Sequence, residues 1–130
     1  MMRQRYVTRD NAAALAETAS RIRALPVDRR AEIAKAAIEL VDGDREIPAT
    51  GRLIFAELLD RLNWENGLVF SRHARLVEAT GAPIQSVEDG IAALRRRQHV
   101  LIESTPAHAT WRATLPALIK AASLLEEPTR

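Results

Sequence analysis

The stretch FSRHARLVEATGAPIQSVEDGIAALRRRQHV, residues 70 to 100, decides the fold. Its apolar residues recur every three to four positions, which indicates helices, and a Gly-Ala-Pro turn at residues 81–83 divides the stretch into two of them. The first helix is predicted at residues 71–80 and the second at residues 84–98. Glycine permits the positive φ that a tight turn needs, so we expect the two helices to cross steeply.

The second of these helices is predicted to have one apolar face and one polar face. Val87, Ile91 and Leu94 follow one another at helical spacing, so we expect them to anchor the helix on a core. This core is expected to be supplied by Leu58, Leu62 and Val77. The opposite face then points outward, and it consists of Ile84, Gln85, Ser86, Glu88, Asp89 and Ala92.

The residues on the N-terminal side are predicted to form three more helices and a short strand. A helix is expected over residues 11–25, and Asp28 is expected to cap a second one, which Gly43 ends. A third helix begins near Ala49, and an Asn-Gly turn separates it from an apolar strand at residues 68–70.

On the C-terminal side the period of the sequence changes from helical to two. Apolar side chains alternate with others at residues 100–103 and again at residues 110–115, around a turn at residues 104–109, which is the pattern of a β-hairpin. Pro116 then opens a last helix. The sequence therefore predicts a mainly α protein with one small β-hairpin.

The order of these elements resembles the winged helix-turn-helix superfamily, in which two helices around a tight turn are followed by a hairpin called the wing. The similarity is to domains of transcriptional regulators and of phage or plasmid replication proteins. It implies a winged helix-turn-helix at residues 47–115, an N-terminal helical segment at residues 1–46 and a C-terminal helix at residues 116–130. The resemblance rests on Phe70, Ser71, residues 76–83, Ser86, Val87, Ile91, Leu94 and Val100.

The resemblance implies that the chain binds double-stranded DNA. In this superfamily the first turns of the second helix lie in the major groove, where Gln85 suits adenine and Ser86 suits a base or a phosphate. Ser71 stands where the N-cap of the preceding helix belongs, and the amides there, with Arg72 and Arg75, suit a phosphate. The full set of expected DNA-binding residues is Ser71, Arg72, Arg75, Ile84, Gln85, Ser86, Glu88, Asp89 and, on the wing, His108, Thr110 and Arg112.

The flanking helices raise the question of oligomeric state. In MarR-like regulators, helices outside the winged domain form the dimer interface, so the resemblance implies a homodimer. Apolar stripes larger than a small winged core requires would form an association surface if they were exposed. The alternative is that the stripes cover one core within a single chain. The stripe residues are Leu15, Ile22, Ile33, Ile38, Leu118 and Leu125.

Two carboxylates on the outward face of the second helix leave other functions open. Glu88 and Asp89 repel phosphate unless they accept hydrogen bonds from cytosine amines, and the net charge of the chain is only +2. The leading hypothesis is a homodimeric transcriptional regulator that binds specific duplex sequences. The alternatives are a replication initiator or accessory protein of a phage or plasmid, and a winged-helix module that binds a protein partner, for instance an anti-activator.

The composition argues against several classes of protein. The 130 residues include no cysteine, which removes disulfides and thiolate zinc sites and suits a reducing cytoplasm. No apolar run approaches the roughly 20 residues of a membrane helix, so we expect a cytoplasmic protein that does not enter a membrane. His73, His99 and His108 have neither metal-ligand spacing nor a carboxylate arranged with them, and the chain has no glycine-rich phosphate loop. We therefore expect no enzyme activity, no metal and no cofactor.

Overall fold

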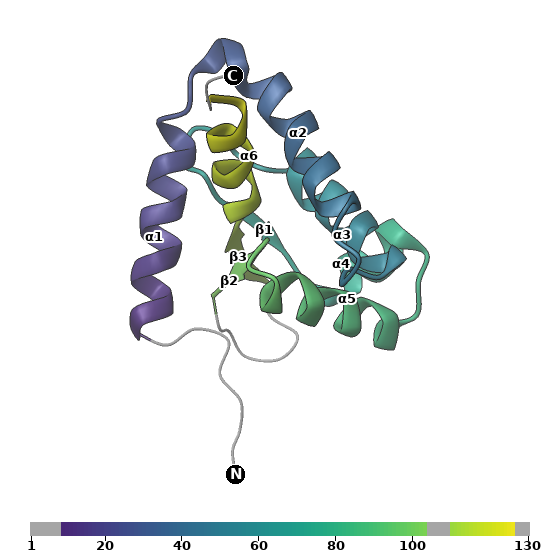
Figure 1. Cartoon of the computed structure of the whole chain (residues 1–130). Helices are drawn as coiled ribbons and strands as arrows, with labels where there is room; N and C mark the ends of the chain where they lie inside the picture. Colours follow the sequence, from purple (N-terminus) through teal and green to yellow (C-terminus); the bar gives the residue numbers. More distant parts are fainter. Residues whose placement is uncertain (1–8, 104–109, 127–130) are drawn as a thin grey trace.

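The computed structural model describes residues 9–103 and 110–126 (Figure 1). The predicted class, mainly helical with a small antiparallel sheet, is confirmed over these residues, which form six α-helices, one short 3-10 helix and three strands. In chain order the elements are α1 (Arg9–Arg23), the 3-10 helix (Val27–Arg29), α2 (Arg30–Asp42), α3 (Ala49–Asp60), β1 (Val69–Ser71), α4 (His73–Thr80), α5 (Ile84–Arg96), β2 (Leu101–Ile102), β3 (Trp111–Thr114) and α6 (Pro116–Glu126).

The three strands form one antiparallel sheet in the order β1-β3-β2, with β3 in the middle. The predicted pairing of the two hairpin strands is confirmed, because Ile102 of β2 lies opposite Ala113 of β3. The turn predicted at residues 104–109 lies outside the described residues. The predicted apolar strand also forms, and it pairs with the other edge of β3, where Phe70 lies opposite Arg112.

Helix α5 packs across α3 with the face that the sequence predicted. Val87, Ile91 and Leu94 are all buried in the core. The two helices approach closely because glycines meet where they cross: a Cβ on Gly90 would lie 3.0 Å from the backbone nitrogen of Gly51. Since one face of α5 is buried in this way, its opposite face lies at the surface.

Gly81 allows the tight turn between α4 and α5. Its φ is 72°, a left-handed conformation that a side chain would strain, and its amide donates to the carbonyl oxygen of Val77 at 2.9 Å. The Thr80 hydroxyl donates to the carbonyl oxygen of Leu76 at 2.7 Å and accepts from the amide of Ala82 at 3.2 Å. The predicted positive φ at this turn is confirmed.

Ser71 does not cap α4, contrary to the prediction from the sequence. It is the last residue of β1, it is 3% exposed, and its hydroxyl has no hydrogen-bond partner among the described residues. Pairing with Trp111 extends the strand through Ser71, and because successive strand residues face opposite sides, Ser71 turns inward while Phe70 turns outward. The N-cap position belongs to Arg72, which makes no side-chain capping hydrogen bond.

The predicted ends of α2 hold only in part. Asp28 lies in the preceding 3-10 helix, and the N-cap of α2 is Arg29, with no side-chain capping hydrogen bond. Gly43 does end α2, but with φ −83° and ψ −5° it stays right-handed instead of adopting the left-handed conformation common at helix ends. The next residue, Asp44, shapes the exit, since its Oδ1 accepts from the amide of Glu46 at 3.0 Å.

The helices outside residues 47–115, which are α1, α2 and α6, pack on the same core as the rest of the chain. Helix α6 packs against both α1 and α2, and Figure 1 shows it between them, above the sheet. Leu15, Ile22, Ile33 and Leu118 are buried, and Ile38 is half-buried against the same core. These five stripe residues are therefore covered within a single chain, which is the alternative that the sequence left open, whereas the sixth, Leu125, is 36% exposed.

Candidate nucleic-acid interface

The outward face of α5 presents the side chains that the sequence assigned to DNA. Gln85, Glu88 and Asp89 are exposed, Ser86 is half-buried, and Ile84 is an apolar side chain that is 48% exposed. Gln85 Nε2 donates to Asp89 Oδ1 at 3.1 Å. This hydrogen bond holds the amide along the helix, so Gln85 has to release Asp89 before it can pair with both polar atoms of an adenine edge.

The start of α4 offers two arginines in different surroundings. Arg72 is exposed at the N-cap. Arg75 is half-buried, and its Nε lies 4.0 Å from Oε2 of Glu57 on α3, an oxygen that also accepts from Nε of Arg61 at 2.6 Å. The positive charge available to a phosphate at this end of α4 therefore comes mainly from Arg72.

A contact between His73 and Trp111 ties the start of α4 to the sheet. Trp111 Nε1 donates to His73 Nδ1 at 3.1 Å, and the rings meet edge to face, with their centroids 6.0 Å apart and their planes at 90°. Because Nδ1 accepts, the proton of the neutral imidazole is on Nε2. Trp111 is buried. The contact fixes Arg72, one residue before His73, relative to β3.

On β3, the charge of Arg112 is balanced by Glu103. Arg112 Nε and Nη2 donate to Glu103 Oε1 and Oε2, both at 2.7 Å, and both side chains are partly exposed. Arg112 can therefore bind a phosphate only if it leaves this carboxylate. Thr110 is exposed directly before β3, whereas His108 lies outside the described residues.

Most of the predicted DNA-binding residues lie at the surface of the structure, but one of them, Ser71, does not. Ser71 lies opposite Trp111 in the antiparallel sheet, so Arg72 and Arg112, which follow these two residues in the chain, lie on opposite sides of this pair. Helix α5 packs against α4. Ser71 itself is buried in the core, because it continues β1, and its side chain is not available to DNA.

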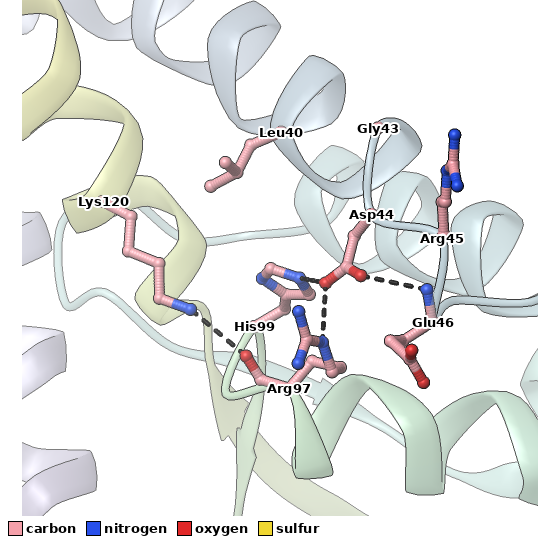
Figure 2. A pocket seen from close by; sticks show the side chains of 8 residues that line it. All are labelled: Leu40, Gly43, Asp44, Arg45, Glu46, Arg97, His99 and Lys120. Carbon is pink, nitrogen blue, oxygen red and sulfur yellow. Dashed lines mark hydrogen bonds and ion pairs between the residues drawn. The ribbon is translucent and has the colours of Figure 1, made fainter.

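A second group of polar residues was missed by the sequence analysis, and it is centred on Asp44 (Figure 2). Asp44 Oδ2 is 2.8 Å from His99 Nε2 and accepts from Arg97 Nε at 3.0 Å. On the opposite side of the group, Lys120 Nζ on α6 donates to the carbonyl oxygen of Arg97 at 3.2 Å. The cluster thus joins the loop after α2, the end of α5 and helix α6.

The surroundings of this cluster set the charges of Asp44 and His99. Burial on its own would raise the pKa of Asp44, but hydrogen bonds from Arg97, His99 and the Glu46 amide outweigh it and hold that pKa well below its usual range. Burial lowers the pKa of His99 more than Asp44 raises it. His99 is therefore a neutral imidazole at pH 7, and because the Asp44 carboxylate can only accept, the proton is on Nε2.

The expectation that no carboxylate is arranged with the histidines is thus wrong for His99. Asp44 and His99 are 55 residues apart in the sequence, so no local spacing relates them. A signal that could have drawn attention to the loop is its run of charged residues, Asp42 to Glu46 around Gly43, in front of the buried Ile47. Within the described residues no group of three or more potential ligands is placed to hold a metal ion.

No protein-family model, curated protein or solved structure matches this chain. In the part of the chain that the structure describes, none of the helices combines the length and the apolar character that crossing a membrane requires.

Proposed function

We propose that the chain binds double-stranded DNA through a winged helix-turn-helix formed by residues 47–115, with α5 as the recognition helix. The observation that supports this proposal is the combination of topology and exposure. The elements follow the order α3, β1, α4, α5, β2, β3, and in the sheet order β1-β3-β2 the strand β3 lies between β1 and β2. Helix α5 is anchored by one face and exposes the other at its first turns, as a recognition helix in the major groove requires.

Each part of this surface has a distinct role in the proposal. Gln85 and Ser86 read base edges, because they are polar and lie in the first turn of α5. Arg72 binds a phosphate and fixes the register of the protein on the duplex, and Arg112 does so after exchange with Glu103. The proposed role of the protein is transcriptional regulation. The alternative role is in the replication of a phage or plasmid, where the same surface would bind repeated sites.

The test is a series of mobility shifts at several salt concentrations, with genomic fragments as probes. Gln85→Ala should weaken only the preferred sequence, by about 1–3 kcal/mol, because it removes a base contact. Arg72→Ala should weaken all sequences alike and reduce the slope of log K against log salt by about one, because it removes a phosphate contact. Arg21→Ala is the matched control, since Arg21 is exposed on α1, away from this surface.

Glu88 gives a sharper test, because the sign of its effect depends on its role. If the carboxylate only repels phosphate, Glu88→Gln tightens specific and non-specific binding together. If it accepts from a cytosine amine, the same substitution weakens the specific complex alone. Failure of all fragments to bind at low salt would contradict DNA binding by this chain.

The exposed apolar and acidic character of α5 favours a second candidate function, a winged helix that binds another protein. Ile84 is 48% exposed beside the exposed carboxylates of Glu88 and Asp89, a combination suited to a partner with apolar and basic side chains. Under this alternative, neither the wild type nor the variants bind DNA. Ile84→Ser and Glu88→Gln instead abolish binding of the protein partner. The salt series decides between the two candidates, since only the first produces a salt-dependent DNA complex.

The homodimer stays a prediction, and of the stripe residues that suggested it only Leu125 is exposed. Val27, in the 3-10 helix, is 72% exposed, and Leu124 and Leu125, at the end of α6, are 57% and 36% exposed. Figure 1 shows this end of α6 beside the connection between α1 and α2. Light scattering that gives the single-chain mass of 14.4 kDa at all concentrations would contradict a dimer.

A further inference from the structure

The cleft beside Asp44 is lined by two polar groups whose interactions within the described residues are incomplete. Its volume is about 510 Å³, and it is lined by residues of the loop after α2, by the end of α5 and by α6. This volume lies within the range of small-molecule pockets, roughly 300–1,000 Å³. The lining residues are Leu40, Gly43, Asp44, Arg45, Glu46, Arg97, His99 and Lys120.

The first of these groups is the Nδ1 atom of His99. The residue is 4% exposed, and Nδ1 has no hydrogen-bond partner among the described residues. Since Nε2 donates to Asp44, Nδ1 of the neutral ring is a hydrogen-bond acceptor. Figure 2 shows this nitrogen turned away from Asp44, toward the side of the cleft where Leu40 and Lys120 lie. A buried acceptor without a donor is unfavourable, so this position favours a ligand that brings one.

The second group is the ammonium of Lys120. Its described contact is the Arg97 carbonyl oxygen at 3.2 Å, and it forms no ion pair with any residue in the described ranges. Burial and the neighbouring charge of Arg97 lower the pKa of Lys120, which means that its positive charge is poorly compensated where it stands. An anion beside Lys120 would stabilise this positive charge, and Lys120 is close enough to His99 to lower the pKa of that residue as well.

We propose that this cleft binds a small carboxylate that carries a hydrogen-bond donor next to the carboxylate, as a 2-hydroxy acid does. The carboxylate accepts from Lys120 Nζ, with the guanidinium of Arg97 nearby, and the hydroxyl donates to His99 Nδ1. Leu40 supplies an apolar wall for the carbon chain of the ligand. The site does not depend on the proposed DNA binding, because none of these side chains belongs to the exposed face of α5.

The site is tested by NMR titration of the whole chain near pH 7.5 at constant ionic strength, read from the imidazole resonances of His99. Three probes separate the two interactions: lactate has both the carboxylate and the donor, acetate lacks the donor, and ethyl lactate lacks the charge. Lactate should give a saturable shift, acetate should bind about 2- to 10-fold more weakly because one hydrogen bond is lost, and ethyl lactate should not saturate. Equal affinity for lactate and acetate would overturn the proposal.

Two variants assign the effect to the cleft. Lys120→Met keeps the length of the side chain and should weaken lactate binding roughly tenfold or more, because a hydrogen bond to a charged group is lost, whereas the matched Lys35→Met, on the exposed side of α2, should not change it. Unchanged lactate binding in Lys120→Met would place the ligand elsewhere and overturn the proposal.

The three probes are compared on the unmodified protein, so this test does not depend on the folding of any variant. A lactate titration without a saturable shift of His99 at ~100 mM, where even millimolar affinity would fill the site, also overturns it.

Discussion

Gly51 of α3 and Gly90 of α5 face each other so closely that a Cβ on Gly90 would lie 3.0 Å from the nitrogen and 3.1 Å from the Cα of Gly51. The obstacle to a larger residue here is backbone, which cannot turn aside as a side chain can. This contact sets the distance between α5 and the helix on which it rests. The position of the proposed recognition helix therefore depends on two residues without side chains.

Gly90→Ala should destabilise the protein, although alanine is the better helix former. The gain in helix propensity is about 1 kcal/mol, whereas the added methyl forces α3 and α5 apart and overpacking of this kind costs about 1–3 kcal/mol. Gly51→Ala should also destabilise the protein, because a Cβ there would lie 2.8 Å from Cγ2 of the buried Ile47. Urea unfolding measures both, and a Gly90→Ala variant more stable than the wild type would show that the helices do not touch here.

Ser71→Ala separates a buried strand residue from a helix cap. A capping serine would lose about 1 kcal/mol on replacement by alanine. The structure instead predicts unchanged or increased stability, because the buried hydroxyl has no partner to lose. Thr114→Val is the matched control: Thr114 is buried and its hydroxyl donates to the Gly67 carbonyl oxygen at 2.7 Å, so valine should cost about 1 kcal/mol. A clear loss for Ser71→Ala would contradict the position of Ser71 in β1.

Under the proposed function, Glu103→Gln should increase the affinity of the chain for DNA without affecting the fold. The substitution frees Arg112 from its bidentate partner, so non-specific binding should tighten and the salt slope should increase by about one. Stability should change by less than about 1 kcal/mol, because pairs between partly exposed charges contribute little. Glu32→Gln, which releases Arg29 on the far side of the molecule, is the control. If both variants bind DNA as the wild type does, Arg112 does not contact the duplex.

The protein should lose stability as the pH falls below about 6.5, the ordinary value for histidine. Burial lowers the pKa of His99 in the folded chain, so the unfolded chain takes up a proton first and is favoured as the pH falls. The charged groups that face this ring are Asp44 from the loop, Arg97 at the end of α5 and Lys120 from α6. Asp44 adds a separate loss only below its ordinary value of 3.8, because its pKa is also lowered by folding.

Urea unfolding between about pH 7.5 and pH 5.5 measures this effect. The contribution of His99 is the difference between the wild type and His99→Gln, since the other histidines titrate in both proteins. The variant should show the shallower dependence on pH. Equal slopes in the two proteins would mean that His99 has the same pKa in the folded and the unfolded chain.

Local sequence determined most of the secondary structure. The spacing of Val87, Ile91 and Leu94 fixed both the existence of α5 and the face that it buries, because helical periodicity is a property of the segment itself. Gly81 fixed the turn, since few residues adopt its positive φ. The change of period after Gln98 likewise predicted the strands that pair as β2 and β3.

Local sequence did not determine which residues meet across the chain. Ser71 fits a helix cap by its position in the sequence, but pairing with Trp111 made it a strand residue, because a ladder of backbone hydrogen bonds outweighs a local capping preference. Asp44 and His99 are 55 residues apart, and only the packing of the loop after α2 against the end of α5 brings them to 2.8 Å. The apolar stripes on α1, α2 and α6 predicted that these helix faces would be buried. Only the tertiary structure decided that they pack against one another within a single chain, because the hydrophobic effect is non-directional and does not specify the partner.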